Sequence, residues 1–571
     1  MSRFGWSLAL FAISGCVGVV GCGSGSGANS ALEPLQLTHV AFEDVQGHPA
    51  PLEDYLTPEA TPSELLVVRL VTPWCGPCQW QRANTESSIT PTLRTRVHVL
   101  DVLLSNEDNG PPGPADIEAW SSASDGFATT VLDRDFALSE LFPKRADLPY
   151  VALVDTKSLN VVYTLTNPSA DDFTLAVDRA VARLDGAKAP TPPKPNLYDG
   201  RFSRDAWAMV QAMALPSEAS RDPTNAYEAV PEAIALGKDL FFDADLSPSP
   251  KQVSCGACHL PELLFQDGKT QAPEGVGMGA RNVPTVVLAT EQRWQFWDGR
   301  ADSAWAQAIM PIEDPNEMAS SRLVVSHVLE RKYKARYAAI FGALPAVSDQ
   351  SRFPLAGKPG DPAWEAMTEV DRTTVNRIFA NVGKAMAAYE RSLRPASNAF
   401  DNYASGDTTA LTEVQKDGLE AFLSAGCIQC HHGPRLTDDS FHNLRVPTGR
   451  PDRAADRGRY DGIAQLLKSD FRRSGAFSDA PTATADIPRD ERLLGAFKTP
   501  GLRGASYTLP YGHGGSFGGL ASTIDAHRTA GLAKESSYAI GTTERWLIEF
   551  APELVPKIEV FLNVLTAEVP Q

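Results

Sequence analysis

The chain has 571 residues and a formal net charge of −18, with 43% hydrophobic and 21% charged residues. This length exceeds what a single hydrophobic core supports, so we expect several domains. The composition is that of a globular protein rather than of a disordered or fibrous one. The acidic balance argues against a nucleic acid as partner, because nucleic acids are bound by basic surfaces.

The first 22 residues have the pattern of a lipoprotein signal peptide. Arg3 precedes an apolar stretch that is interrupted by glycine and serine, and it is too short to span a membrane. The stretch ends in Val-Val-Gly-Cys, which resembles a lipobox and would make Cys22 the lipidated first residue of the mature protein. Cys16 ends a similar pattern, and a plain cleaved signal peptide is the alternative. We therefore expect a protein of the cell envelope that faces the periplasm and is anchored to a membrane by its lipid.

The following 150 or so residues alternate between two periodicities. Residues 35–186 contain buried-strand patterns at 65–71, 97–104 and 150–154, with helix-like stretches between them. This alternation predicts an α/β domain. Residues 187–198 are rich in proline and predict an extended linker to the rest of the chain.

Beyond the linker, the pattern Cys-x-x-Cys-His occurs twice. The first copy is formed by Cys255, Cys258 and His259, and the second by Cys427, Cys430 and His431. Two thiols at this spacing can add to the two vinyl groups of one haem, and the adjacent histidine then coordinates the iron. The surrounding sequence has helical apolar spacing, so the repeat predicts two mainly α-helical c-type cytochrome domains, at 199–400 and 401–571. A zinc site built from both cysteine pairs is the competing interpretation, although zinc requires neither the following histidine nor secretion.

From about residue 230 to its end, the chain resembles the bacterial diheme cytochrome c peroxidases and their MauG-type relatives. The resemblance is carried by stretches in the family's order, which include residues 237–243, 281–285, 296–301, 497–503 and 510–513. It implies a cytochrome-c-peroxidase-type oxidoreductase that reduces hydrogen peroxide to water. The electrons would come through the second haem from a donor protein, a cytochrome c or a cupredoxin. The resemblance is also compatible with a homodimer.

Two other classes of function remain open at this stage. One is a MauG-type oxidase that modifies a partner protein, which would turn over poorly with cytochrome c. The other is an electron carrier or a haem-linked thiol–disulfide oxidoreductase in which the peroxide chemistry has been lost.

The resemblance also assigns roles to individual residues. Glu317 and Gln307 match residues of the distal pocket above the first haem, where a carboxylate moves a proton between the peroxide oxygens. Trp297 matches a tryptophan between the two haems that would relay an electron. Surface placement of Glu317 and plain packing of Trp297 are the ordinary alternatives. A calcium ion between the domains would be held by Asn282, Thr508 and Pro510, whose oxygen ligands suit this cation.

The sequence departs from the family at the ligands of both irons. Many members carry a histidine in the loop before Arg281 that caps the first iron, but residues 267–281 contain none, and Met278 is the nearest soft ligand. The first iron should therefore be open in the resting enzyme. The chain also has no methionine after Met386, which rules out the usual His–Met pair on the second haem.

A histidine replaces that methionine. His527 stands fourteen residues after His513, where MauG-type enzymes have tyrosine. This position predicts that His431 and His527 ligate the second iron together, which would lower its potential relative to a His–Met haem. Weaker candidates for the same place are His432, His442 and His513.

A third cysteine pair lies in the predicted α/β domain. Cys75 and Cys78 follow a strand pattern in the sequence Trp-Cys-Gly-Pro-Cys, at the start of a predicted helix, where thiols become reactive. The motif resembles the thioredoxin fold, whose cis-proline loop is matched by Pro149. The pair is expected to be redox-active, with a purely structural disulfide as the alternative. Nothing in the sequence links this pair to the haems, so we expect the two sites to work independently.

Overall fold

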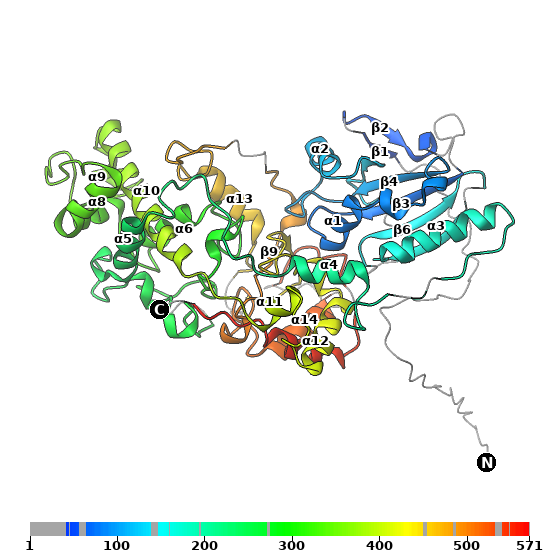
Figure 1. Ribbon diagram of the computed structural model, residues 1–571. Helices are drawn as coiled ribbons and strands as arrows, with labels where there is room; N and C mark the ends of the chain where they lie inside the picture. Colours follow the sequence, from blue (N-terminus) through cyan, green and yellow to red (C-terminus); the bar gives the residue numbers. More distant parts are fainter. Residues whose placement is uncertain are drawn as a thin grey trace, which may run out of the picture.

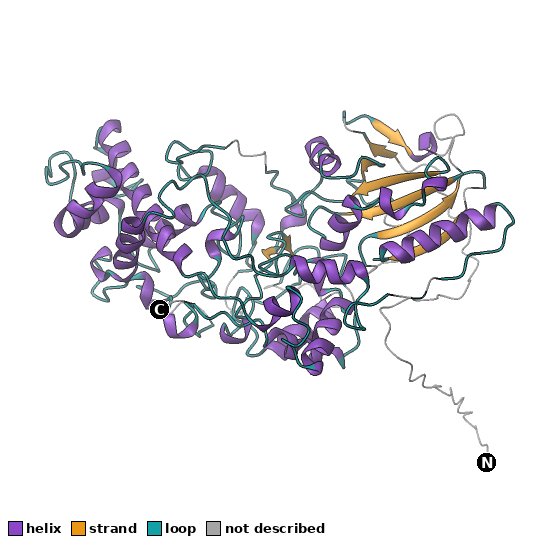
Figure 2. Cartoon of the chain, in the orientation of Figure 1, coloured by secondary structure: helices purple, strands orange, loops and turns teal. Residues whose placement is uncertain are grey.

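The computed structural model describes residues 41–569, apart from residues 45, 56–63, 139–146, 159, 193, 195, 271–274, 449–453, 483–486, 531–538 and 548. Cys22 lies outside these residues. The chain forms a sheet-containing unit at one end and a larger, mainly helical part (Figures 1 and 2). Among the helices of the described residues, none combines the length and the apolarity that a membrane crossing requires.

The N-terminal unit is built on a seven-stranded sheet with the strand order β2-β1-β5-β4-β3-β6-β7. The strands β3 and β4 are parallel, β4 and β5 are parallel, and β6 runs antiparallel to β3. Every residue of β3 is buried, as expected of a central strand that is covered on both faces. The expected α/β domain is thereby confirmed. The strands are β1 (Ala41–Glu43), β2 (Pro49–Pro51), β3 (Leu65–Val71), β4 (Val97–Leu103), β5 (Ala128–Leu132), β6 (Tyr150–Asp155) and β7 (Val161–Thr166).

Helices cover both faces of this sheet (Figure 1). The helix α1 (Gly76–Ala83) begins directly after β3 and the short turn that holds Cys75. The helix α3 (Ala170–Leu184) packs its apolar side against one face of the sheet, and α2 (Pro114–Ser122) packs beside β5. The linker that follows α3 has no helix or strand among its described residues.

The helical part has two halves, each with its own core. The first core surrounds the long helix α10, where α5 and α6 make close contacts with it. A Cβ atom at Gly237 on α5 would lie 1.9 Å from the carbonyl oxygen of Ala385, so glycine allows these two helices to touch. The helices of this half are α5 (Pro231–Phe242), α6 (Ala304–Glu313), α7 (Arg322–Val328), α8 (Lys334–Phe341), α9 (Pro362–Glu365) and α10 (Glu369–Ser392).

The second core lies between the first half and the sheet unit (Figure 1). It includes α4, which comes from the start of the helical part, because Trp207 packs edge-on against Tyr403 at 5.4 Å. Conversely, Ala567, near the C-terminus, packs against residues of the first half. The boundary expected near residue 400 therefore does not separate the two cores. The elements of the second half are α4 (Arg204–Ala212), α11 (Ala399–Ala404), α12 (Glu413–Ser424), β8 (Phe441–His442), α13 (Arg459–Lys468), β9 (Phe497–Lys498), α14 (Leu520–Thr529) and α15 (Leu554–Leu562).

A buried ion pair fixes the sheet unit against the second half. Asp108, on the loop after β4, is only 5% exposed, and its carboxylate accepts hydrogen bonds from Arg459 at 2.9 Å and from the Trp294 indole at 2.8 Å. Arg459 is 0% exposed, and its guanidinium lies over the rings of Trp294 and Phe441. A guanidinium so far from water needs its carboxylate, because separation would leave an uncompensated buried charge.

Replacement of Asp108 tests this interface. Asp108→Ala should lower the free energy of unfolding by about 3–5 kcal/mol, since it leaves Arg459 buried without a partner. The neighbouring Glu107 pairs with Arg293 on the surface, where its side chain is 59% exposed, so Glu107→Ala should cost less than about 1 kcal/mol. Denaturant unfolding followed by tryptophan fluorescence measures both. Equal, small effects of the two substitutions would contradict the buried anchor.

Candidate active site

A single cavity of about 340 Å³ is shared by the two Cys-x-x-Cys-His motifs. Most of its exposed wall is apolar, as an iron porphyrin requires. The two cysteine pairs belong to different cores, with Cys255 packed in the first half and Cys427 in the second. This separation does not fit a zinc site built from both pairs. The cavity wall includes His259, Trp297, Gln307, Cys427, Cys430, His431 and His527.

The first motif presents its histidine as an iron ligand would be presented. Cys255 starts a 3-10 turn, and the backbone N–H of His259 donates to its carbonyl at 2.9 Å. The His259 Nδ1 donates to the carbonyl of Phe265 at 2.9 Å, which leaves Nε2 for a metal. Burial lowers the pKa of His259, so its ring is neutral at physiological pH, as coordination requires.

The second motif has a histidine on each side of one site. His431 donates from Nδ1 to the carbonyl of Leu436 at 3.0 Å, and His527, on α14, donates from Nδ1 to the carbonyl of Thr523 at 2.8 Å. The two ring centres are 6.4 Å apart. Two metal–nitrogen bonds of about 2 Å each, with the two half-rings added, give roughly this spacing. Burial, and then His527, lowers the pKa of His431 to about 4, so this ring is neutral as well.

The weaker histidine candidates are used elsewhere or lack this facing geometry. His432 donates from Nε2 to the carbonyl of Trp74 at 2.8 Å, away from the cavity. Both nitrogens of His442 meet carboxylates, Asp438 at 2.9 Å and Glu544 at 2.7 Å. Burial lowers the pKa of His442, but the charge and the hydrogen bond of Asp438 raise it, so the two carboxylates favour a proton on each nitrogen. His513 lies on the cavity wall, stacked on Phe497 at 3.5 Å.

Of the two predicted distal residues, only one reaches the cavity wall. Gln307, on α6, lines the cavity formed by the described residues, whereas Glu317, on the turn after α6, does not. The carbonyl of Glu317 accepts from the N–H of Val276, on the loop that lacks a histidine. Burial, and then the charge of Asp314, raises the pKa of Glu317 to about 7. Met278, on the same loop, is 47% exposed.

The expected calcium ligands come together beside Trp297, whose indole donates to the carbonyl of Asn282 at 2.9 Å. The Asn282 side chain lies 2.6 Å from the carbonyl oxygen of Pro510. Gln266 completes the group, because its Nε2 donates to Asn282 Oδ1 at 3.4 Å and to the carbonyl of Thr508 at 3.3 Å. Amide and carbonyl oxygens suit a hard cation. The sequence pattern did not single out Gln266, which stands seven residues after His259 without a motif of its own.

The chain is similar to known proteins over most of its helical part. The family model of the di-haem cytochrome c peroxidases matches residues 231–409. The methylamine utilization protein MauG of Methylorubrum extorquens is 35% identical over 345 residues, which cover 59% of this chain and 79% of MauG. The cytochrome c551 peroxidase of Pseudomonas aeruginosa is 29% identical over 388 residues, which cover 64% of this chain and 90% of that enzyme.

The chain belongs to the di-haem cytochrome c peroxidase family. Membership implies two c-type haems, and both Cys-x-x-Cys-His motifs have the thiols and the oriented histidine to hold one. Among solved structures, the diheme peroxidase BthA of Burkholderia thailandensis covers 62% of this chain and 91% of its own, with a TM-score of 0.45 and 23% identity. A thioredoxin-like protein from Aeropyrum pernix covers 25% of this chain and 90% of its own, with a TM-score of 0.20 and 18% identity.

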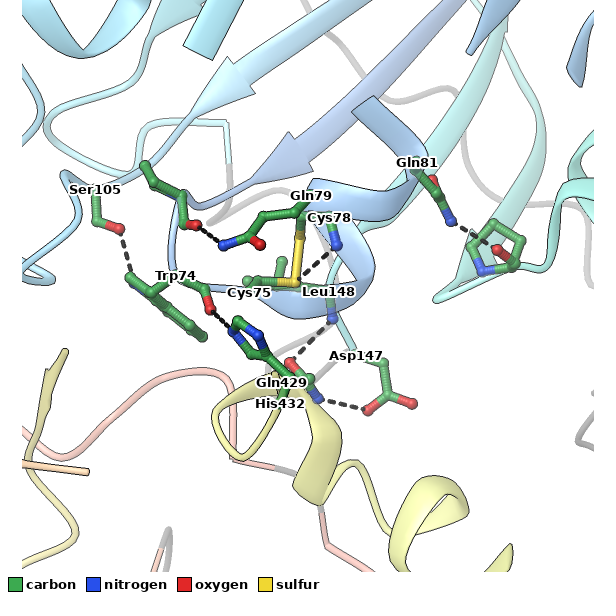
Figure 3. The surroundings of a disulfide bond; sticks show 12 residues. Trp74, Cys75, Cys78, Gln79, Gln81, Ser105, Asp147, Leu148, Gln429 and His432 are labelled. Carbon is green, nitrogen blue, oxygen red and sulfur yellow. Dashed lines mark hydrogen bonds between the residues drawn. A yellow bond between two sulfur atoms is a disulfide. The ribbon is translucent and has the colours of Figure 1, made fainter. Parts of the chain in front are cut away.

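The thioredoxin-like unit of this family member carries a buried disulfide. Cys75 and Cys78 are bonded to each other, and both are 0% exposed (Figure 3). Cys75 caps the start of α1, where its sulfur accepts the N–H of Cys78 at 3.2 Å. The Leu148–Pro149 peptide bond is cis, and Leu148 packs in the same cluster as the two cysteines. The expected cis-proline loop thus lies beside the pair.

The disulfide faces the second haem motif, which the sequence did not indicate (Figure 3). His432 bonds to the carbonyl of Trp74, and the N–H of Leu148 donates to Gln429 at 3.4 Å. The Trp74 ring meets the His442 ring edge-on at 4.7 Å. These partners are hundreds of residues apart in the chain, so no local pattern could have placed them together.

Substitution of His527 tests the ligation of the second iron. In the oxidised, haem-loaded protein, we expect one high-spin and one low-spin iron in the electron paramagnetic resonance spectrum. His527→Ala should convert the low-spin signal to high spin, because the second axial nitrogen is lost, and leave the first signal unchanged. The matched control is His432→Ala, which removes a histidine next to the motif without changing either signal. A low-spin signal that survives in His527→Ala would contradict the assignment.

Proposed function

We propose that the protein is a diheme peroxidase that reduces hydrogen peroxide to water with electrons from an external donor through the second haem. The observation that supports this proposal is the shared cavity, whose wall includes one histidine of the first motif and a facing pair of histidines at the second. A carboxyl with a pKa of about 7, that of Glu317, lies on the turn after α6, next to Met318, which packs in the same core as Cys255. An iron with two histidines is suited to carry electrons, and one with an open side is suited to bind peroxide.

The residues around the first site have separate tasks. A haem held by Cys255, Cys258 and His259 would supply the iron chemistry that breaks the O–O bond. Glu317 takes a proton from one peroxide oxygen and returns it to the other, for which a pKa near the working pH is best. The Gln307 amide orients the peroxide from the cavity wall, and Trp297, on the wall of the same cavity, relays an electron between the two haems.

Three further features belong to the same proposal. Asn282, Thr508 and Pro510 would hold a calcium ion that braces the two halves beside Trp297. A cytochrome c or a cupredoxin would donate the electrons from outside. Cys22 would anchor the protein by a lipid, so that the enzyme works at the periplasmic face of a membrane. A lipid anchor and the covalent attachment of haem both belong to exported proteins.

A MauG-type oxidase is the second candidate, and the facing pair of His431 and His527 favours it. Two histidines give a lower potential than histidine and methionine, which weakens the case for a high-potential donor. The two functions separate by turnover, since a peroxidase is reduced rapidly by a small cytochrome and a MauG-type oxidase is not.

The pH dependence of turnover tests the role of Glu317. The carboxylate form must accept the first proton, so kcat/KM should rise with pH around a midpoint of about 7. Glu317→Gln should keep both haems and lower kcat/KM by roughly a hundredfold or more. It should also remove the rise of kcat/KM with pH. Asp314→Asn should instead move the midpoint to lower pH, because Asp314 raises the pKa of Glu317. An unchanged pH profile in Glu317→Gln would contradict the assignment.

A further inference from the structure

The Cys75–Cys78 disulfide is closed off from outside partners. Both cysteines are 0% exposed, and thiol–disulfide exchange requires an attacking thiolate to reach one of the sulfurs. The cover comes from the second haem motif, where His432 lies over the turn that carries the pair. While the unit is docked, the group that the sulfurs face is therefore the second haem site (Figure 3).

The contact between the two motifs is close and specific. A Cβ atom at Gly76 would lie 2.8 Å from the His432 ring, nearer than such atoms come, so only glycine fits against this histidine. The turn before the disulfide and the cis-proline loop each make one hydrogen bond to the second haem motif, through Trp74 and Leu148. Their partners, His432 and Gln429, flank the cysteine and the histidine that hold the second haem.

Side chains also connect the disulfide with the wall of the haem cavity. Cys430, a haem attachment point, packs against the cluster that contains Trp74, Cys75 and Cys78. The Trp74 ring contacts His442, and His442 also lines the haem cavity. Packed side chains thus connect the sulfurs with the second haem site.

We propose that the reduced Cys75–Cys78 pair is an internal electron donor for the peroxide reaction. The two thiols lose two electrons and two protons and close the S–S bond. One hydrogen peroxide takes up these electrons and protons, its O–O bond breaks, and two water molecules form. A haem held by Cys427, Cys430 and His431 would supply the one-electron relay between the thiols and the site where peroxide reacts. An external dithiol restores the pair when the unit undocks. This inference rests on the proposed peroxidase function.

A single turnover of the haem-loaded, full-length protein tests the proposal. The pair is reduced, the reductant is removed without oxygen, and one equivalent of hydrogen peroxide is added. A maleimide mass tag, located by peptide mass, then counts the free thiols of Cys75 and Cys78. We expect two thiols to disappear for each peroxide, roughly a hundredfold faster than in Glu317→Gln. Direct attack of peroxide on the thiols would proceed equally in both proteins.

Variants of the contact show whether the electrons use it. Gly76→Ala places a methyl group against His432, and Asp108→Ala loosens the docking from a distance. Each should slow thiol oxidation by about tenfold or more, because overpacking or a lost anchor disfavours the docked state. The double variant Gly76→Ala/His432→Ala should be faster than Gly76→Ala, since the shorter side chain makes room for the methyl group, but slower than the wild type, since the hydrogen bond to Trp74 is lost.

Turnover with a small one-electron donor separates this proposal from the peroxidase function. If that turnover is fast while the thiols oxidise no faster than in Glu317→Gln, the internal donor is refuted and the peroxidase function stands. If neither reaction occurs with both haems attached, the peroxidase function itself is refuted. Thiol oxidation at the wild-type rate in both Gly76→Ala and Asp108→Ala would also overturn the proposal, because the contact would then carry no electrons.

Discussion

The ion pair between Asp108 and Arg459 is the constraint on which the arrangement of the molecule depends. Both side chains of the pair are buried, so separation of the thioredoxin-like unit from the cytochrome part would leave a buried charge without its partner or expose it to water. The loop that carries Asp108 also makes hydrogen bonds to the residues around it. Trp74 donates from its indole to Ser105 and Asn109, and Asn109 donates to Glu544 at 2.6 Å. One loop thereby joins the disulfide turn, the interdomain anchor and the wall of the second haem site.

Hydrogen bonds to backbone carbonyls orient the histidines of both haem motifs. His259, His431 and His527 each donate from Nδ1 to a main-chain oxygen, which would leave Nε2 for a metal. The sites then differ in what stands opposite. His527 faces His431 at the second site, while Gln307 and a protonatable carboxyl lie near the first. Under the proposed function, this division would suit the second site to electron transfer and the first to the reaction with peroxide.

The parts of the fold and the site that follow local rules could be predicted from the sequence. The strands at 65–71 and 150–154 are continuous apolar runs, and the two haem motifs have a spacing that one chemistry explains. The facing position of His527 followed from its distance to a family motif. The strands and the haem motifs depend on neighbours in the chain, where periodicity and spacing carry the information. The place of His527 came from the family resemblance instead.

The remaining features depend on the fit between distant surfaces, for which the sequence has no period. Gln266 joins the predicted calcium ligands, although it belongs to no motif. Helix α4 packs in the second core rather than the first. The docking of the disulfide on the second haem motif was also missed, so the expectation of independent sites has given way to the proposal that they are coupled.

The labelling rate of the reduced Cys75 and Cys78 thiols with a bulky polyethylene glycol maleimide tests the docked arrangement most directly. The haem cysteines are thioethers and do not react, and peptide masses locate the label. If the unit is docked, labelling of the native protein is slow, because it waits for the unit to open, and Asp108→Ala accelerates it. Labelling as fast as that of an exposed thiol, with no effect of Asp108→Ala, would contradict the account.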